Sequence, residues 1–423
     1  MKLLHTSDLH LGQMMYGQER VEEHGLFLRW LLDLIRTERV EGLIIAGDIF
    51  DSASPPQSAL RQYYDFLREL IALQCPALII GGNHDSGQVL NAPRDLLRAL
   101  GHIHVHGIAA EDNREALIPW PDTQAPEVLL CACPYLRDGD LRRSGAAETQ
   151  SDVREKLKAG LIQHYADLLE ASKGYREAGV PTIATGHLTL NGTSSGEGER
   201  EIHLGAGGLV TGQDLGASHL DFQGFDYIAL GHIHRAQVLH NKEHVRYSGS
   251  PVPLSFSEAE DVKEVVLLET RRADPHRGTP SSVTAQSIAV PNWRRLVRWE
   301  GTLDEVCAAI QAFESNADQT LDPWADLKIQ SDLAPQIIDA KLLEALKGKN
   351  LRVLRMRKIE TVQRNTEPAF AESRADLHEL NPRDVFAQKC ADEGHAMNTE
   401  LGARLHSTFA ELLEMHQQQV AAR

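Results

Sequence analysis

The stretch that most constrains the fold of this chain is residues 43–51, which read Leu-Ile-Ile-Ala-Gly-Asp-Ile-Phe-Asp. An apolar run followed directly by a glycine is typical of a parallel strand that is covered on both faces. In open α/β sheets, functional groups gather beyond the carboxyl ends of such strands, and Asp48 and Asp51 stand at that place. The stretch therefore predicts an α/β protein with an acidic site at one edge of a sheet.

The same form, an apolar strand followed by an Asp, Asn or His, recurs along the chain. The predicted strands of this form are 2–6, 43–46, 78–80, 182–185 and 226–230. Helices predicted between the first three of these strands indicate βαβ units and a parallel sheet. The polar residues that follow the strands are Asp8, His10, Asp48, Asn83, His84, His187, His232 and His234.

These side chains form a mixed set of oxygen and nitrogen donors. Asp8 and His10 are two residues apart, so along an extended segment they project to the same side and can grip one divalent ion. The set is too large for one cation but suits two cations that share Asp48, with His84 left over. Two such cations bind a phosphoryl oxygen and hold a water for in-line attack. The set therefore predicts phosphoester hydrolysis, and its imidazoles favour Mn²⁺, Fe or Zn over Mg²⁺.

His84 is placed for acid catalysis because it adjoins the predicted ligand Asn83 without being needed as a ligand itself. It is suited to protonate the leaving oxygen or to neutralise the charge that develops there. Such a histidine needs a partner that fixes its tautomer, and Asp51 at the end of the neighbouring strand is the candidate. Asp85 is interpreted as a helix cap.

Length and charge bound the remaining possibilities. A chain of 423 residues predicts two or three domains, and its scattered cysteines fit a reducing cytosol. No apolar run is long enough for a membrane span, and the N-terminus enters a strand without a signal-peptide layout. The net charge of −17 argues against a nucleic-acid partner. Residues 347–358 qualify this, because they carry six Lys or Arg and no acid.

The composition changes after about residue 270. Residues 271–281 are charged and contain Pro and Gly, which predicts a linker, and 290–362 then alternate strand and helix as a small α+β domain does. Residues 376–423 read as helical with an apolar stripe, which either folds back on its own domain or docks into a partner. The Gly- and Ser-rich residues 191–216 are either a mobile loop over the site or an insertion, and the sequence leaves both questions open.

The ordered set resembles the calcineurin-like metallophosphoesterases and, within them, the SbcD subunits of SbcCD nucleases, the bacterial relatives of the eukaryotic double-strand-break repair nuclease. The resemblance covers the first 270 residues firmly and the remainder more loosely. A stretch specific to this subfamily is Tyr247-Ser-Gly249-Ser250-Pro251-Val-Pro253-Leu254-Ser255-Phe256. The shared motifs are His5-Thr-Ser-Asp8-Leu-His10-Leu-Gly12, Ala46-Gly-Asp48-Ile-Phe-Asp51, Gly82-Asn83-His84-Asp85-Ser86, Ala184-Thr-Gly186-His187-Leu188 and Tyr227-Ile-Ala-Leu-Gly231-His232-Ile-His234-Arg235-Ala236.

The resemblance implies a two-sheet α/β β-sandwich flanked by helices, then a small α+β capping domain and C-terminal helices. The implied boundaries are 1–275, 285–365 and 376–423, and the helices of the last part would dock to the base of the SbcC coiled coil. Some archaeal relatives carry a His at the position of Asp51, so the orienting role of this residue rests on geometry and not on the family. The implied site has His84 as the catalytic residue and metal ligation by Asp8, His10, Asp48, Asn83, His187, His232 and His234.

The function that the resemblance implies is that of a Mn²⁺-dependent nuclease subunit. It would act as an exonuclease on double-stranded DNA ends and an endonuclease on hairpins, gated by ATP in the SbcC ATPase, in DNA repair, recombination and replication. The subunit would be cytoplasmic and nucleoid-associated, and would form a homodimer within a heterotetramer. DNA would be contacted by Lys347, Lys349, Arg352 and Arg355.

Two other classes of function remain. A stand-alone phosphatase or phosphodiesterase for small substrates shares the dimetal set but does not require the capping domain and the tail. A non-enzymatic scaffold on an inactive phosphoesterase fold has no need to keep His84 together with the whole ligand set, so the complete set argues against it.

Overall fold

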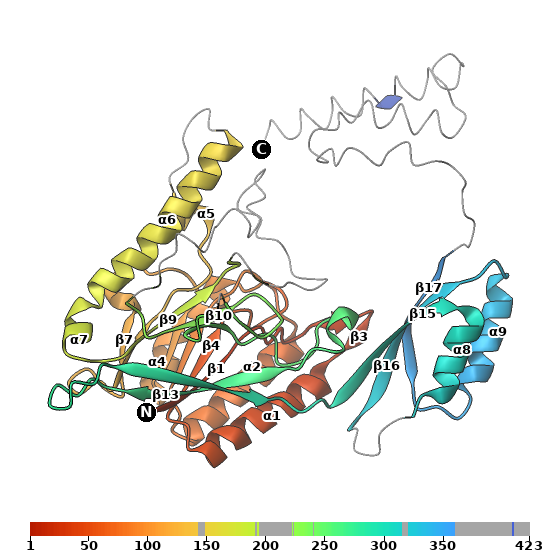
Figure 1. The fold of residues 1–423 in the computed structure, drawn as a ribbon, viewed down its shortest axis with the longest axis horizontal. Helices are drawn as coiled ribbons and strands as arrows, with labels where there is room; N and C mark the ends of the chain where they lie inside the picture. The colour runs from red at the N-terminus through yellow and green to blue at the C-terminus, as the bar shows by residue number, and fades with distance from the viewer. Residues whose placement is uncertain are drawn as a thin grey trace. The chain divides into compact units, whose positions relative to one another are not determined.

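The computed structural model describes residues 1–142, 149–190, 193, 222, 224–239, 241–314, 320–359 and 408–409 (Figure 1). The chain divides into two compact units, Met1–Thr361 and Val362–Arg423. The predicted tail helices fall in the second unit and, apart from 408–409, lie outside the described residues, as does nearly all of 191–216. In the part that is described, no helix is both long and apolar enough to cross a membrane.

The first sheet is a parallel core extended on one side by antiparallel strands. Its strand order is β14-β13-β1-β4-β5-β6. The parallel strands are β1 (Lys2–Thr6), β4 (Gly42–Ala46), β5 (Ala77–Ile80) and β6 (Ile103–His106), and the antiparallel ones are β13 (Glu264–Arg271) and β14 (Ser282–Ala289). The predicted βαβ series is therefore confirmed.

Helices cover the outer face of this sheet. They are α1 (Val21–Glu38), α2 (Gln57–Ala72), α3 (Gly87–Asn91) and α4 (Arg94–Gly101). Alternation along β4 divides its side chains, so that Leu43 and Ile45 pack with α1 and α2 while Ile44 and Ala46 face the second sheet. A strand that is buried on both faces explains why residues 43–46 form an unbroken apolar run.

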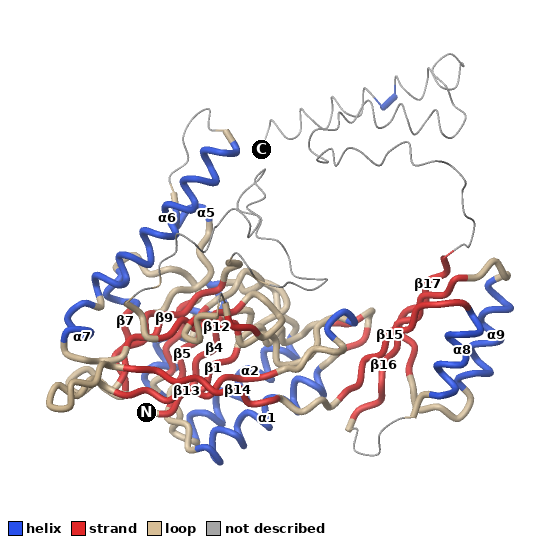
Figure 2. Tube along the Cα trace, in the orientation of Figure 1, coloured by secondary structure: helices blue, strands red, loops and turns tan. Residues whose placement is uncertain are grey.

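The second sheet packs face to face on the first. Its strand order is β11-β12-β10-β9-β8-β7. These strands are β7 (Leu117–Trp120), β8 (Val128–Cys131), β9 (Thr182–His187), β10 (Tyr227–Gly231), β11 (Gln237–Val238) and β12 (Val245–Tyr247). Helix α6 (Gln150–Ala171) packs its buried leucines on the same core, and the strands lie between α1 and α6 (Figure 2).

Short elements complete this part of the chain. They are β2 (Met14–Met15), β3 (Gln18–Glu19), α5 (Asp138–Leu141), α7 (Lys173–Glu177) and the 3₁₀ turns Asn113–Ala116 and Phe256–Glu258. β2 and β3 form a hairpin directly after the motif that contains Asp8 and His10.

The small domain has its own sheet and its own core. β15 (Arg294–Thr302), β16 (Leu321–Gln330) and β17 (Arg352–Ile359) are parallel, with α8 (Leu303–Ala312) and α9 (Pro335–Leu346) as crossovers. Both helices lie side by side on one face of the sheet (Figure 1) and bury Val306, Ile310 and Ile338 against it. The predicted alternation of strand and helix is confirmed here.

One boundary differs from the sequence prediction. Residues 271–281 were expected to be a linker, but they form the turn of a hairpin between β13 and β14, which pair along their whole length. The first sheet therefore extends to Ala289 and not to about residue 275. Many β14 side chains are exposed, so the strand lacks the apolar alternation by which it could have been recognised.

Candidate metal centre

The predicted ligands come from both sheets and meet at one end of the sandwich. β1, β4 and β5 run parallel in the first sheet, and β9 and β10 run parallel in the second. Asp8, Asp48 and Asn83 follow the first three strands, whereas His187 ends β9 and His232 follows β10. Strand direction alone thus brings distant parts of the sequence to a shared edge, as expected for α/β sheets.

Hydrogen bonds to the backbone fix the ligand loops to one another. The amides of Asp8 and His10 each donate over 3.0 Å, to Gly47 O and Asp48 O respectively. The two sheets are joined in the same way, because the amide of His232 donates to Asp8 Oδ1 over 2.9 Å. The ring of His187 donates from Nδ1 to the carbonyl oxygen of Ala46 over 2.9 Å. The site is therefore organised by its own backbone.

Four of the ligand residues have left-handed backbone conformations. The φ angles are 53° at Asp8, 44° at His10, 48° at Asp48 and 97° at His232. Residues other than glycine rarely adopt positive φ, and such strain is concentrated at functional sites. Space is equally restricted, because a Cβ on Gly82 would lie 2.1 Å from Asp48 Oδ1.

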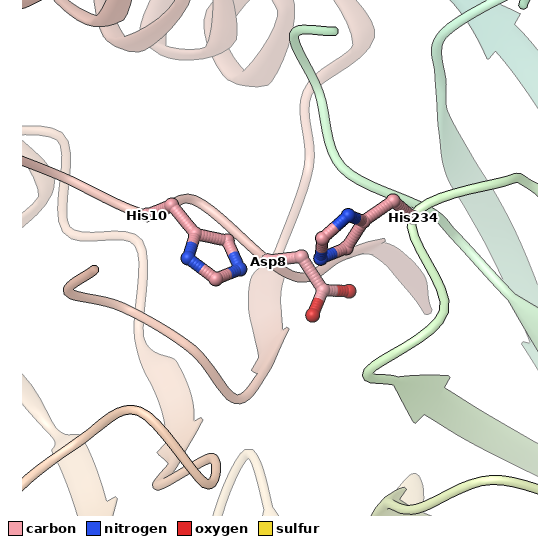
Figure 3. Close-up of side chains that lie close together, drawn as sticks. All are labelled: Asp8, His10 and His234. Carbon is pink, nitrogen blue, oxygen red and sulfur yellow. The ribbon is translucent and has the colours of Figure 1, made fainter. Parts of the chain in front are cut away.

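Asp48 lies at the centre of the site. Its Oδ2 is 3.3 Å from His187 Nε2 and 3.5 Å from His10 Nε2. One group of donors, Asp8, His10 and His234, converges on one side (Figure 3). Asp48 itself belongs to two further groups of metal-binding spacing, one with His187 and His232 and the other with His10 and His84. The carboxylate of Asp48 thus belongs to both of these groups, and its role as a shared ligand stays a prediction.

The donor atoms fit a cation because their lone pairs face one another. Asn83 Oδ1 is 2.9 Å from His187 Nε2 and 2.9 Å from His232 Nδ1. His187 donates from Nδ1, so Nε2 of its neutral ring carries a lone pair. This lone pair faces those of Asn83 Oδ1 and Asp48 Oδ2, and only a proton or a metal ion between the atoms relieves their repulsion. His10 Nε2 is buried and has no hydrogen-bond partner in the described part of the chain.

Without a cation, the electrostatics favour the metal-binding forms of Asp48 and His232 and the protonated form of His187. Burial opposes ionisation of Asp48, but His187 and His10 outweigh it and hold the pKa of that carboxyl well below its usual range. Burial and the neighbouring His187 lower the pKa of His232 to about 3, so its ring is neutral at pH 7. Against the opposing effect of burial, Asp48 raises the pKa of His187 to about 9. A bound cation would replace that proton between the two side chains.

His84 is oriented by the main chain of Asp51. Its Nδ1 donates to the backbone carbonyl oxygen of Asp51 over 2.8 Å. The carboxylate of Asp51 instead accepts from His10 Nδ1 over 3.1 Å. The main chain of Asp51 therefore holds His84, and the side chain of Asp51 holds His10, which is a candidate ligand. The half-buried ring of His84 lies edge-on to that of His10, with ring centroids 4.8 Å apart.

Asp85 is not a helix cap, contrary to the sequence interpretation. Ser86 caps α3 by accepting from the amide of Val89. The buried carboxylate of Asp85 accepts from the amides of Ile49, Phe50 and Gly82 over 3.1, 2.9 and 2.8 Å. It thereby ties the loop after β4 to the loop after β5. Burial, together with Asp48, raises the pKa of Asp85 to about 6.

The basic cluster is largely occupied by contacts with other residues of the chain. Lys347 pairs with Glu344, and Lys349 donates to the carbonyl oxygens of Gln311 and Phe313. Arg355 makes a bidentate pair with Asp326 over 2.9 and 2.8 Å, and its guanidinium stacks over the ring of Tyr16. Arg352 is exposed. The charge run seen in sequence is thus only in part a free basic surface.

Comparisons with known proteins identify the family of the chain. Residues 1–236 match the family described as calcineurin-like phosphoesterase, and residues 292–394 match the one described as Type 5 capsule protein repressor C-terminal domain. The chain is 34% identical over 397 residues to the SbcD subunit of the nuclease SbcCD from Escherichia coli (strain K12), with 93% of each chain covered. It is 32% identical to the corresponding subunit from Rhodobacter capsulatus, with 92% of this chain and 94% of the relative covered.

Proposed function

The chain belongs to the calcineurin-like phosphoesterases and, among them, to the SbcD subunits of SbcCD nucleases, and on that basis we propose that it hydrolyses DNA phosphodiesters with two divalent cations. The observation that carries the proposal is the position of Asp48 Oδ2, which lies between the ring nitrogens of His10 and His187. A carboxylate so placed can serve two cations at once. The protein is accordingly a metal-dependent phosphodiester hydrolase.

The residues divide between two cation positions. Asp8, His10 and His234 would hold one cation, and Asn83, His187 and His232 the other, with Asp48 shared. When bound, such a pair supplies a Lewis acid for the phosphoryl oxygen and an activated water. Carboxylate oxygens combined with imidazole nitrogens suit Mn²⁺, which we propose as the working metal.

His84 would supply the proton for the leaving group. Its Nδ1 proton is committed to the carbonyl oxygen of Asp51, which leaves Nε2 as the nitrogen that exchanges a proton with substrate. A group so oriented can neutralise the 3′ or 5′ oxygen as the phosphorus–oxygen bond breaks. Because the main chain of Asp51 fixes this tautomer, the arrangement does not depend on the ionisation of a partner.

The small domain would hold the DNA over the cations. Lys347 and Arg352 are exposed before and at the start of β17 and would contact phosphates. Lys349 and Arg355 would contribute less, because internal partners hold them. The subunit would pair with itself and with two copies of the SbcC ATPase, which would control access of duplex ends and hairpins through ATP.

The test is cleavage of a labelled DNA duplex and a DNA hairpin with Mn²⁺, with and without SbcC and ATP. Mn²⁺-dependent cutting that increases with SbcC and is lost in His84→Ala supports the proposal. A small phosphodiester assayed in parallel serves as the control for the metal centre. Intact DNA under every condition, together with rapid hydrolysis of the small substrate, would instead identify a stand-alone phosphodiesterase.

A further inference from the structure

Residues 248–263, called here the support segment, connect β12 to β13 and lie beside the metal centre. They begin within the stretch Tyr247–Phe256, which is specific to the subfamily in sequence but has no role in the site as described so far. In the structure this segment touches the loops that carry Asp8 and His234. Both residues belong to the same group of three donors, together with His10.

The segment supports Asp8 through serine hydroxyls. Ser248 Oγ is 2.8 Å from Ser7 Oγ, and the hydroxyl of Ser7 donates to the carboxylate of Asp8. Ser7, Asp8 and Ser248 are all fully buried. The carboxylate also accepts from the amide of His232, so its orientation is determined from two sides.

The segment supports His234 through a buried ion pair. Glu258 Oε1 approaches His234 Nδ1 to 3.6 Å, and Glu258 Oε2 pairs with Lys263 Nζ at 2.5 Å. Lys263 also donates to the carbonyl oxygen of His234 over 3.0 Å and to Ser250 Oγ over 2.9 Å. The ring and the backbone of His234 are therefore held by the two members of one pair.

The stability of the fold alone does not explain such a pair. Glu258 is 2% exposed and Lys263 is 6% exposed, and removing two charges from water offsets much of their mutual attraction. Carboxylates that stand behind metal-ligating histidines, by contrast, fix the ring and raise its basicity. Glu258 occupies that place relative to His234 Nδ1, which leaves Nε2 with a lone pair for a ligand.

The two cation positions differ in the charge of the groups that contact their histidine ligands. His10 and His234 belong to the same group of donors as Asp8. The carboxylate of Asp51 contacts Nδ1 of His10, and the carboxylate of Glu258 approaches Nδ1 of His234. His187, on the other side of Asp48, is instead held by the neutral carbonyl oxygen of Ala46. A negatively charged acceptor makes an imidazole a stronger donor than a neutral one does. The asymmetry is built into the chain's own residues.

We propose that Glu258 and Lys263 are positioning residues that set the affinity of one cation position, the one lined by Asp8, His10 and His234, and leave the other unchanged. The inference rests on the proposed function, because it assumes two cation positions. It adds a division of labour, in which the support segment serves one position alone.

The test is a titration with Mn²⁺ of the metal-free full-length chain, followed by calorimetry and by electron paramagnetic resonance. The wild type should bind two ions, whose spin coupling gives a characteristic signal. Glu258→Gln should weaken one of the two binding steps by about 10- to 100-fold and remove the coupled signal at limiting Mn²⁺, with the other step unchanged. Lys263→Met should shift the same step, since it frees the carbonyl oxygen of His234.

Asp226→Asn is the matched control. The carboxylate of Asp226 accepts from the amide of Thr182 over 2.8 Å at the start of β9, whereas the ligand His187 lies at the end of that strand. This variant should leave both binding steps as they are in the wild type. Ser250→Ala removes a hydrogen-bond partner of both Lys263 and Glu258, so it should weaken the same binding step to a smaller extent. This variant covers the case in which Glu258→Gln fails to fold.

Three results would overturn the inference. Unchanged binding steps in both Glu258→Gln and Ser250→Ala would show that the segment does not act on the metal. Equal weakening of both steps, with a lower melting temperature of the metal-free protein, would show a general structural role. If the wild type itself binds fewer than two ions, the proposed function fails first, and the inference falls with it.

Discussion

The backbone carbonyl oxygen of Asp51, and not its carboxylate, accepts the Nδ1 proton of His84 over 2.8 Å. Asp51 thus contacts two histidines through different atoms, because its carboxylate accepts from His10 over 3.1 Å. The two functions can be separated by mutation, since a change of side chain leaves the main-chain acceptor in place.

Asp51→Asn should therefore weaken metal binding while leaving the orientation of His84 intact. We expect the Mn²⁺ concentration for half-maximal activity to rise about tenfold, with kcat recovered when Mn²⁺ is saturating. His84→Ala should lower kcat about 10²- to 10⁴-fold at any Mn²⁺ concentration. The measurement is the Mn²⁺ dependence of small-phosphodiester hydrolysis. A fall in kcat of Asp51→Asn that Mn²⁺ does not restore would contradict this assignment.

Asp85→Asn should destabilise the protein, because an amide cannot accept from all the backbone N–H groups that the carboxylate serves. We expect a loss of about 1–3 kcal/mol in the free energy of unfolding, measured with denaturant on the metal-free protein. Ser86→Ala, which removes the cap of the short helix α3, is the neighbouring control and should cost about 0.5 kcal/mol. Equal losses in the two variants would refute a special role for Asp85.

His5 should make the fold sensitive to acid. It is fully buried beside Tyr227, and burial lowers its pKa from 6.5 to about 3. Because the unfolded chain takes up a proton before the folded one does, the contribution of His5 is complete above pH 6.5 and is lost as the pH falls toward 3. The expected slope is about 1.4 kcal/mol per pH unit in that window.

His5→Gln removes this titration and keeps a polar group for Tyr227, so the dependence of unfolding free energy on pH should be shallower by that amount. Replacing the exposed His276 by Gln provides the comparison. Identical slopes for wild type and His5→Gln between pH 6 and pH 4, measured by denaturant unfolding, would disprove the prediction.

Arg352 and Arg355 should behave differently although they lie close together in the basic cluster. Arg352→Gln should weaken DNA binding at all sequences and reduce the slope of log affinity against log salt by about one. Arg355→Gln should mainly destabilise the small domain, because it removes a partner of Asp326, which is 0% exposed and also pairs with Arg298 and Arg357. Salt-dependent DNA binding and thermal unfolding of both variants distinguish the two effects, and a reversed pattern would contradict them.

The fold and the position of the site could be predicted because both depend on short, continuous stretches of sequence. Each strand of the motif series is a short apolar run, and each ligand follows its strand within a few residues, so Asp48 and His187 could be placed without knowledge of tertiary structure. The family assignment, which rested on the order of these motifs, is confirmed.

What could not be predicted depends on which atom of a residue faces which neighbour. The sequence named Asp51 as the partner of His84 but could not say which atom takes part, and the turn after β4 directs the backbone carbonyl there. Arg355 read as a free cation because its partner Asp326 lies on the adjacent strand, beyond the reach of any local pattern. The strand β14 was missed because its exposed, polar face resembles a linker.

The left-handed conformations of Asp8, His10, Asp48 and His232 bear on how inactive forms of this protein are made. Substitution by alanine at these positions has two effects at once. It removes the candidate ligand, and it places alanine in a backbone conformation that alanine tolerates poorly. Asparagine keeps both size and tolerance of positive φ, so Asp8→Asn and Asp48→Asn report the loss of the carboxylate without added backbone strain. Any comparison of alanine variants across the site would otherwise confuse chemistry with conformational strain.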